Sequence, residues 1–283
     1  MTTISVHPNQ TSLWRQFAVH SRGELKIFVS TPAAMLFTAA MPVIAYGIAG
    51  FANRANATMS MPFGSYQLQA GDRYYAAMMA FALFAAAFLS TAVGMGSRRL
   101  DGRFRRLRTT AANPVPVMAA LLGTWFLVAL ASGAAITLLG TTLFGVQMTV
   151  EQSLRVLLCS LLGVVTYMML GFAVSLFFRS TESAVPLANL IYIPLVFLSG
   201  IFYDIDLGTV GNQIVNLLPL RPLLTLLASG FGNPEQPIDV TAILVLLGWI
   251  AVSALVVLWR FRWASESEPR RGRHSRGPLR TRG

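Results

Sequence analysis

Charged residues are scarce in this sequence, and cysteine and lysine are nearly absent. Only 12% of the 283 residues are charged, against roughly 25% in ordinary soluble domains. The single cysteine, Cys159, has no second thiol with which to form an internal bridge, which excludes a disulfide scaffold. Hydrophobic residues instead make up 54% of the chain, and its mean hydropathy is +0.59. These values exclude a water-soluble globule and favour a membrane protein.

Six segments contain no Asp, Glu, Lys, Arg or His and are long enough to cross a bilayer. A hydrocarbon core of about 30 Å requires roughly 20 apolar residues in a helix. We therefore predict an all-α integral membrane protein with an N-terminal segment (1–32), a transmembrane domain (33–260) and a basic, disordered tail (261–283). The six predicted spans are 33–51, 74–96, 115–144, 156–178, 185–202 and 241–259.

The positive charges lie mostly in segments that six crossings place on one side of the membrane. Eighteen of the 22 Lys and Arg residues precede the first span or lie in the second connection, the fourth connection or the tail. By the positive-inside rule both termini are predicted to be cytoplasmic. The net charge of +11 then follows from topology, so we expect contact with membrane lipid and no nucleic-acid partner.

An amphipathic helix is predicted before the first span, between Ser12 and Phe28. Its apolar side chains recur at helical spacing, while its basic side chains fall on another face, which is typical of a helix in the headgroup layer. Such a helix serves either as a topology anchor or as an elbow that also contacts a cytoplasmic partner. The predicted interfacial helix presents Trp14, Arg15, Phe17, Arg22 and Lys26 at the membrane surface.

The second connection is unusually rich in arginine. Leu100, Phe104 and Leu107 are spaced i, i+4 and i+7, so a short helix would present them as one apolar ridge. The ridge is flanked by Arg99, Arg103, Arg105, Arg106 and Arg108. A groove in a soluble protein could bind such a ridge; the alternative is a solvated loop enriched in arginine by topology alone.

The last outer connection follows Gly200 and contains an apolar stretch, 210–227, that is broken around Arg221 by Pro219 and Pro222. The stretch is too apolar for a loop in water. It is also too interrupted for a seventh span, which would bury Arg221 at about 2.5–3.5 kcal/mol. We predict a re-entrant helical hairpin between spans five and six.

The residues required for several kinds of transport and catalysis are missing from the predicted spans. The predicted spans hold no carboxylate or histidine, which disfavours ion-coupled transport, intramembrane proteolysis and metal catalysis. The pattern G-x-x-x-x-G-K-[ST] does not occur, so the chain is not predicted to be an enzyme, and it is expected to bind no cofactor itself. Any energy input must then come from another polypeptide.

Aromatic, methionine and amide side chains are the groups in the spans best suited to an apolar or amphipathic substrate. For each one, ordinary helix packing is the alternative interpretation. The predicted substrate path comprises Tyr74, Tyr75, Met78, Phe81 and Phe84 in the second span and Asn189 and Tyr192 in the fifth.

Three motifs resemble one family. Residues 102–114, GRFRRLRTTAANP, are similar to its glycine, basic cluster and proline between spans two and three. Residues 194–202, PLVFLSGIF, are similar to its fifth span, and Leu218-Pro219 precedes the last span as in its broken hairpin. The chain thus resembles the ABC-2-type (type 2) permease subunits of ATP-binding-cassette exporters, including the daunorubicin-resistance-like drug permeases.

This resemblance implies a six-helix half-transporter in a bacterial plasma membrane. It implies a second permease subunit, identical or different, and two copies of a cytoplasmic P-loop ATPase that hold ATP and Mg. Arg99 to Arg108 would form the coupling helix, and a drug or lipid would move outward, as in multidrug efflux and antibiotic resistance. The alternatives are an exporter of an envelope lipid or glycan precursor and a non-transporting membrane scaffold.

Overall fold

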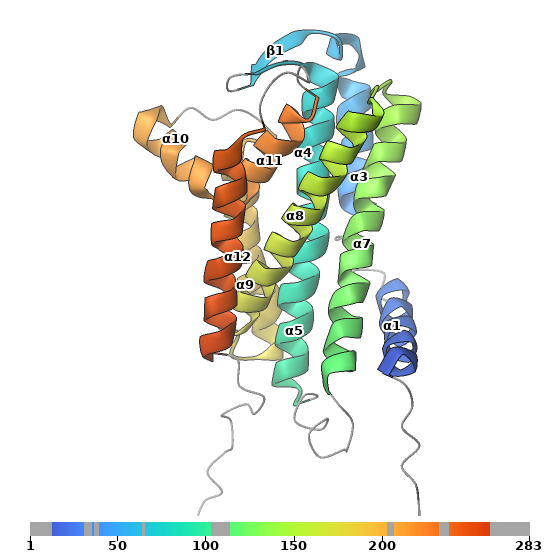
Figure 1. The fold of residues 1–283 in the computed structure, drawn as a ribbon, viewed down its shortest axis with the longest axis vertical. Helices are drawn as coiled ribbons and strands as arrows, with labels where there is room; N and C mark the ends of the chain where they lie inside the picture. Colours follow the sequence, from blue (N-terminus) through green and yellow to red (C-terminus); the bar gives the residue numbers. More distant parts are fainter. Residues whose placement is uncertain are drawn as a thin grey trace, which may run out of the picture.

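The computed structural model describes residues 13–30, 36, 40–63, 66–102, 114–202, 207–231 and 238–260. These residues form a mostly helical body in which long helices run side by side (Figure 1). The helices are α1 (Leu13–Val29), α3 (Met41–Ala52), α4 (Ala70–Phe84), α5 (Ser90–Leu100), α7 (Pro114–Leu143), α8 (Val150–Ser175), α9 (Thr181–Leu198), α10 (Gly208–Leu217), α11 (Leu220–Ser229) and α12 (Val240–Arg260).

Among the described residues, five continuous helical segments are long and apolar enough to cross a membrane: 70–100, 117–143, 150–175, 181–198 and 240–260. They overlap predicted spans two to six. The first predicted span, 33–51, is described mainly from residue 40 onward, where α3 has 12 residues and is shorter than a full crossing. Five spanning helices agree with a membrane protein, and the count of six stays a prediction.

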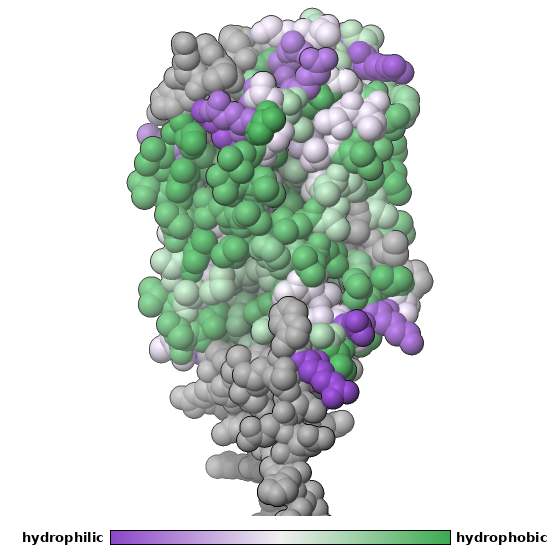
Figure 2. Space-filling model, turned by 45° about the vertical axis from the view of Figure 1, so that its right-hand side comes forward, coloured by the Kyte–Doolittle hydropathy of each residue, from purple (hydrophilic) through white to green (hydrophobic). Residues whose placement is uncertain are grey.

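The two ends of the body differ in character. At one end, named here the arginine end, lie α1, the last turn of α5 and the last turn of α12; at the other, the distal end, lie the β-strands, α10 and α11 (Figure 1). Between the two ends, Figure 2 shows a broad hydrophobic band on the face that it presents. A band of this kind is what a lipid-facing surface requires.

Local sequence signals explain where several helices begin. Thr149 and Ser180 each form a capping box, with Gln152 and Ser183 respectively, so α8 and α9 start at fixed residues. Helix α7 begins at Pro114, and proline is favoured in the first turn because its missing N–H would have no partner there. Helix α9 also contains two internal prolines, which membrane helices tolerate when neighbouring groups satisfy the freed carbonyls.

The helix formed by α4 and α5 is the buried centre of the body. A π-helical turn, Ala85–Leu89, joins its two halves, and α3, α7, α8, α9 and α11 pack around it. Small residues permit this close packing: Ala76, Ala80 and Ala86 have no exposed surface. Gly171 of α8 lies directly against the π-helical turn, since a Cβ atom there would be 2.6 Å from the carbonyl oxygen of Phe88.

The distal end contains the one pair of strands within the described residues, which the all-α prediction omitted. β1 (Ser60–Phe63) pairs antiparallel with β2 (Tyr66–Gln69) and so connects α3 to α4. Strands of four residues that include a proline give too weak an alternating pattern to be predicted from sequence. The hairpin ends directly at the first residue of the central helix.

Helices α10 and α11 meet at Leu218 and Pro219, where the sequence predicts a break. They differ sharply in burial: no residue of α10 is buried, whereas most of α11 is buried against α4, α8 and α12. Helix α10 projects from the side of the body (Figure 1), and its end is attached to α12 by the indole of Trp249, which donates to the Leu217 carbonyl at 2.8 Å. Whether the pair is re-entrant stays a prediction.

The contact at Gly171 can be tested with one methyl group. Gly171→Ala places that methyl against backbone atoms of the π-helical turn that cannot rotate away, so we expect a loss of about 1–3 kcal/mol in stability. The measurement is the thermal unfolding midpoint of the purified chain in detergent. Gly248→Ala is the matched control, because no atom lies within 4 Å of the added methyl on α12. Equal midpoints for the two variants would show that the contact is not tight.

Candidate functional site

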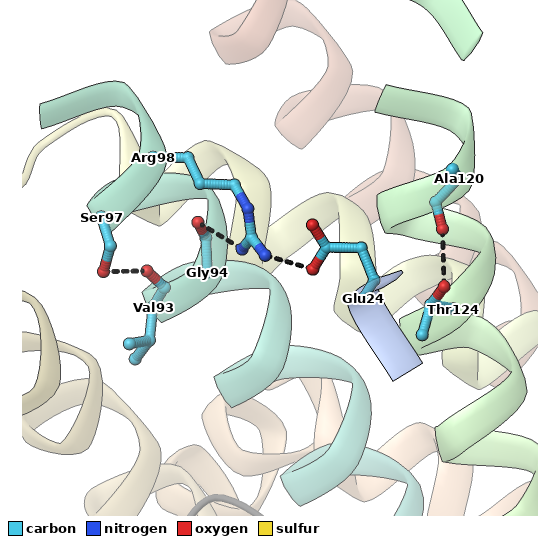
Figure 3. Close-up of polar contacts among 7 residues, drawn as sticks. All are labelled: Glu24, Val93, Gly94, Ser97, Arg98, Ala120 and Thr124. Carbon is cyan, nitrogen blue, oxygen red and sulfur yellow. Dashed lines mark hydrogen bonds and ion pairs between the residues drawn. The ribbon is translucent and has the colours of Figure 1, made fainter. Parts of the chain in front are cut away.

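Arg98, in the last turn of α5, joins three helices at the arginine end. Its guanidinium forms an ion pair with Glu24 of α1 and donates to the Gly94 carbonyl at 3.1 Å (Figure 3). The same group lies over the Trp125 ring of α7, 5.4 Å from its centroid. Trp125 can lie this close because residue 94 is glycine: a Cβ atom there would be 2.1 Å from the indole. Arg98 thus connects α5 to both α1 and α7.

Arg99, the next residue, reaches the C-terminal end of α8 instead. It donates to the carbonyl oxygens of Phe178 at 2.7 Å and Ser175 at 3.3 Å. Arg260, at the end of α12, donates to the neighbouring Leu176 carbonyl at 3.3 Å and lies over the Phe177 ring. The last carbonyls of a helix lack intrahelical partners and carry partial negative charge, so two arginines are well suited to stabilise them.

Helix α9 is attached at the same place. The Thr181 hydroxyl, at the start of α9, donates to the Asp101 carboxylate at 3.1 Å. Leu100 packs on a small apolar cluster formed by Ala92, Phe178, Ala184 and Ala188. Residues 98–101 therefore contact α1, α7, α8 and α9. We call residues 98–101, together with Glu24, Trp125, Thr181 and Arg260, the basal junction.

The predicted coupling helix is described only at its start. Arg99 and Leu100 belong to the basal junction, whereas Arg103, Phe104, Arg105, Arg106, Leu107 and Arg108 lie outside the described residues. The last described residue here is Gly102, whose positive φ of 68° favours glycine and is typical of the residue that follows the end of a helix. The predicted coupling residues thus directly follow the basal junction in the sequence.

One predicted residue of the interfacial helix packs against the protein, and its basic residues are exposed. The Phe17 ring lies against Gly123 of α7, 3.4 Å from where a Cβ atom would be, while Arg15, Arg22 and Lys26 are exposed. The structure describes the backbone of Trp14 but not its side chain. Sequence reasoning missed Glu24, although one signal was available: it is the only acidic residue among residues 1–32.

The predicted substrate path separates into groups with different neighbours. Phe84 stacks on Tyr192 of α9 at 5.1 Å between ring centroids, and Phe81 lies 6.3 Å from the same ring. Phe88, which lies within the π-helical turn, extends this stack. Asn189 lies half-buried one turn away on α9. This α4–α9 aromatic stack brings part of the predicted set together.

The other predicted path residues lie elsewhere. The Tyr75 hydroxyl bonds to Thr137 of α7 at 2.8 Å, and the Tyr74 hydroxyl donates to Asn53 at the end of α3 at 3.2 Å. Met78 is buried in the core. Sequence spacing could not separate these faces, because nearly every side of the central helix is covered by protein.

The predicted outer hairpin residues meet the end of α9. Arg221 donates to the Ser199 carbonyl at 3.1 Å, and Arg73, which the sequence did not single out, donates to the Gly200 carbonyl at 3.5 Å. Gly200 has a φ of 80°, a conformation that favours glycine. The Tyr167 hydroxyl of α8 donates to the Pro219 carbonyl at 3.4 Å, and Pro222 is buried in α11.

The ion pair of Glu24 and Arg98 can be tested against a second pair in the same chain. Glu24 is only 18% exposed, whereas Glu151, which pairs with Arg155 one turn along α8, is 62% exposed. We expect Glu24→Ala to reduce the free energy of unfolding by about 1.5–3 kcal/mol, because it leaves a half-buried guanidinium without its carboxylate. Glu151→Ala should reduce it by about 0.5 kcal/mol or less. Thermal unfolding measures both, and equal losses would contradict the assignment.

A comparison with protein-family models finds a match over most of the chain. The family described as "ABC-2 type transporter" matches residues 9–231, from ahead of α1 to just past α11, and so includes the basal junction except Arg260. No curated protein matches the chain. The match spans well over half of the sequence and contains the three motifs for which the resemblance was noted. The chain therefore belongs to the ABC-2 type transporter family.

Proposed function

We propose that the chain is the permease subunit of an ATP-binding-cassette exporter in a bacterial plasma membrane, where it moves an amphipathic or hydrophobic substrate outward. Two copies of a separate P-loop ATPase would bind and hydrolyse ATP with Mg²⁺, since the sequence contains no P-loop pattern. A second permease subunit, identical or different, would complete the membrane part. Family membership supports the permease assignment, and the basal junction is the observation that carries the mechanism.

The arginine end is the proposed cytoplasmic end. Arg98 and Arg99 at the end of α5, Arg179 between α8 and α9, and Arg260 at the end of α12 lie at this end, and residues 103–113 directly follow α5 in the sequence. The positive-inside rule places such segments in the cytoplasm, where an ATPase could reach them. Docking at this end would bring the ATPase directly under the central helix.

Force would enter through the arginine-rich connection and reach four helices at once. A push on residues 103–108 is transmitted along the backbone to the last turn of α5. From there Arg98 transmits it to α1 and α7, and Arg99 transmits it to the end of α8. Hydrogen-bonded charge contacts are short and directional, so they can transmit a displacement between helices better than apolar contacts that slide.

The proposed response is a rotation of the central helix against α9. The π-helical turn lies in the middle of that helix, and such turns are frequent at functional sites. The α4–α9 aromatic stack lies beside the turn, so its stacked rings would have to slide when the two helices rotate. In this mechanism the stack forms the part of the substrate path that opens and closes.

The absence of charge in the spans favours an apolar or amphipathic substrate. Residues 74–97, 156–178 and 183–198 contain no ionisable Asp, Glu, Lys, Arg or His, so the sequence offers no group there to neutralise a free ion. Both a drug and a lipid fit this description. ATPase assays with drugs and with envelope lipid precursors would separate a drug exporter from an envelope-precursor exporter.

Charge reversal in the connection tests the coupling role. A tagged chain is purified from its own host membranes, and P-loop proteins that co-purify are identified by mass spectrometry. We expect the triple variant Phe104→Ala, Arg105→Glu, Arg106→Glu to lose the ATPase, because it removes both the apolar ridge and its flanking charge. Arg270→Glu with Arg271→Glu, in the tail, is the control and should retain it.

Two results would contradict the proposal in different ways. If the triple variant retained the ATPase and its stimulated activity, residues 103–108 would not be the coupling segment. If even the unaltered chain brought down no P-loop protein, the membrane-scaffold alternative would be favoured.

A further inference from the structure

A cavity of about 530 Å³ lies between α4, α7 and α8, toward the distal half of the body. Tyr75, Met79 and Leu83 of α4 line one side of it, and the 130–141 segment of α7 and the 153–160 segment of α8 line the others. The α4–α9 aromatic stack is formed by other residues of the central helix and does not line this cavity. Its volume falls within the range of drug-sized ligand sites.

The cavity opens between lipid-facing side chains. Leu138 of α7 is 64% exposed and Leu157 of α8 is 49% exposed, and both line the cavity. Both helices are long and apolar enough to cross a membrane, so this opening faces the hydrocarbon layer. Ala134, also exposed and lining the cavity, is too small to close the opening. A molecule dissolved in the bilayer could therefore enter from the side.

The hydroxyl groups in the cavity share one property: their protons are engaged in internal hydrogen bonds. Thr137 lies in position to donate to the Gly133 carbonyl at 3.0 Å, and in that arrangement the Tyr75 phenol donates the 2.8 Å bond that joins it to Thr137. Ser160 donates to the Val156 carbonyl at 2.7 Å. A hydroxyl has a single proton but two lone pairs. Each of these groups has therefore used its donor and keeps acceptor capacity.

The same holds at the rim. Thr141 donates to the Thr137 carbonyl at 3.0 Å, and Ser153 donates to the Thr149 carbonyl at 2.9 Å. All five hydroxyls of the lining are thus acceptors toward a ligand. A ligand group that only accepts hydrogen bonds would have to displace one of these internal bonds, and an anion would lose its hydration with little compensation.

We propose that this cavity binds an apolar molecule that carries a hydrogen-bond-donating hydroxyl or amine group and enters laterally from the bilayer. The size, the opening and a lining whose hydroxyl protons are already engaged in internal hydrogen bonds all favour this chemistry. A neutral lipid alcohol and a hydrophobic amine drug share it. This inference goes beyond the proposed export function, because the site lies apart from the aromatic stack and needs no ATPase to bind.

A matched pair of probes tests the donor requirement. The full chain in lipid nanodiscs is exposed to a long-chain alkanol with a photoreactive diazirine, or to its methyl ether, which keeps the oxygen but lacks the proton. Labelled peptides are identified by mass spectrometry. We expect saturable labelling of the 130–160 region by the alkanol, and roughly fivefold weaker saturable labelling by the ether, the loss of one hydrogen bond.

Paired variants on α7 test the location. Ala134→Phe should fill the opening and abolish saturable labelling, whereas Ala131→Phe, on an exposed residue outside the lining, should retain it. Thr141→Val should weaken labelling by removing one acceptor, while Thr142→Val, whose hydroxyl donates to the same helix outside the cavity, should not. All four positions are exposed, and an unchanged thermal midpoint confirms that each variant is folded.

Competition identifies the source of the ligand. An excess of monoacylglycerol represents the lipid alcohols, and an excess of a hydrophobic primary amine represents the drugs; competition by either supports the site and names its source. Competition by neither, equal labelling by alkanol and ether, or labelling that survives Ala134→Phe would each overturn the proposal. None of these results depends on ATPase co-purification, so the two proposals fail independently.

Discussion

Two guanidinium groups on consecutive residues of α5 hold the arginine end of the body together. Arg98 faces α1 and α7, and Arg99 faces the exposed carbonyls at the end of α8, because adjacent residues on a helix point about 100° apart. Each arginine has several donors in a rigid fork, so each can bind a different helix. The remaining basal contacts, at Asp101 and Arg260, add α9 and α12 to the same junction.

Packing of the central helix depends on a different constraint. Between membrane helices there is little hydrophobic gain, so close approach of backbones through small residues has to supply the contact. Alanines around the central helix and Gly171 of α8 meet this need, since a Cβ atom at Gly171 would overlap the backbone at Phe88. Gly94 and Gly96 instead leave room for the rings of Trp125 and Phe178. The aromatic rings of Phe84, Phe88 and Tyr192 then fill the larger space on the side of α9.

Much of the fold could be predicted from charge-free runs, because a membrane helix must satisfy its own backbone and therefore leaves a long apolar signature. The strands at 60–69 could not be, since four residues carry too little pattern. The arginine end was predictable from composition, but the partners of Arg98 and Arg99 were not. Glu24 and Trp125 lie 74 and 27 residues from Arg98, the arginine that both of them meet, and the packing of α1 against α7 places them together. The residues of the predicted substrate path lie in separate groups in the structure. Helical spacing shows which residues share a face of a helix, but it does not show which neighbouring helix packs against that face.

The π-helical turn has a geometric consequence for the whole central helix. Such a turn holds one residue more than an α-helical turn, and each residue of an α-helix advances its side chain by about 100°. Moving that surplus residue along the chain would change the phase of every side chain between its old and new positions, with little change in length. Gly171 lies against this turn and would keep the surplus residue in place, which fixes the rotation of the α4 side chains about the helix axis relative to those of α5.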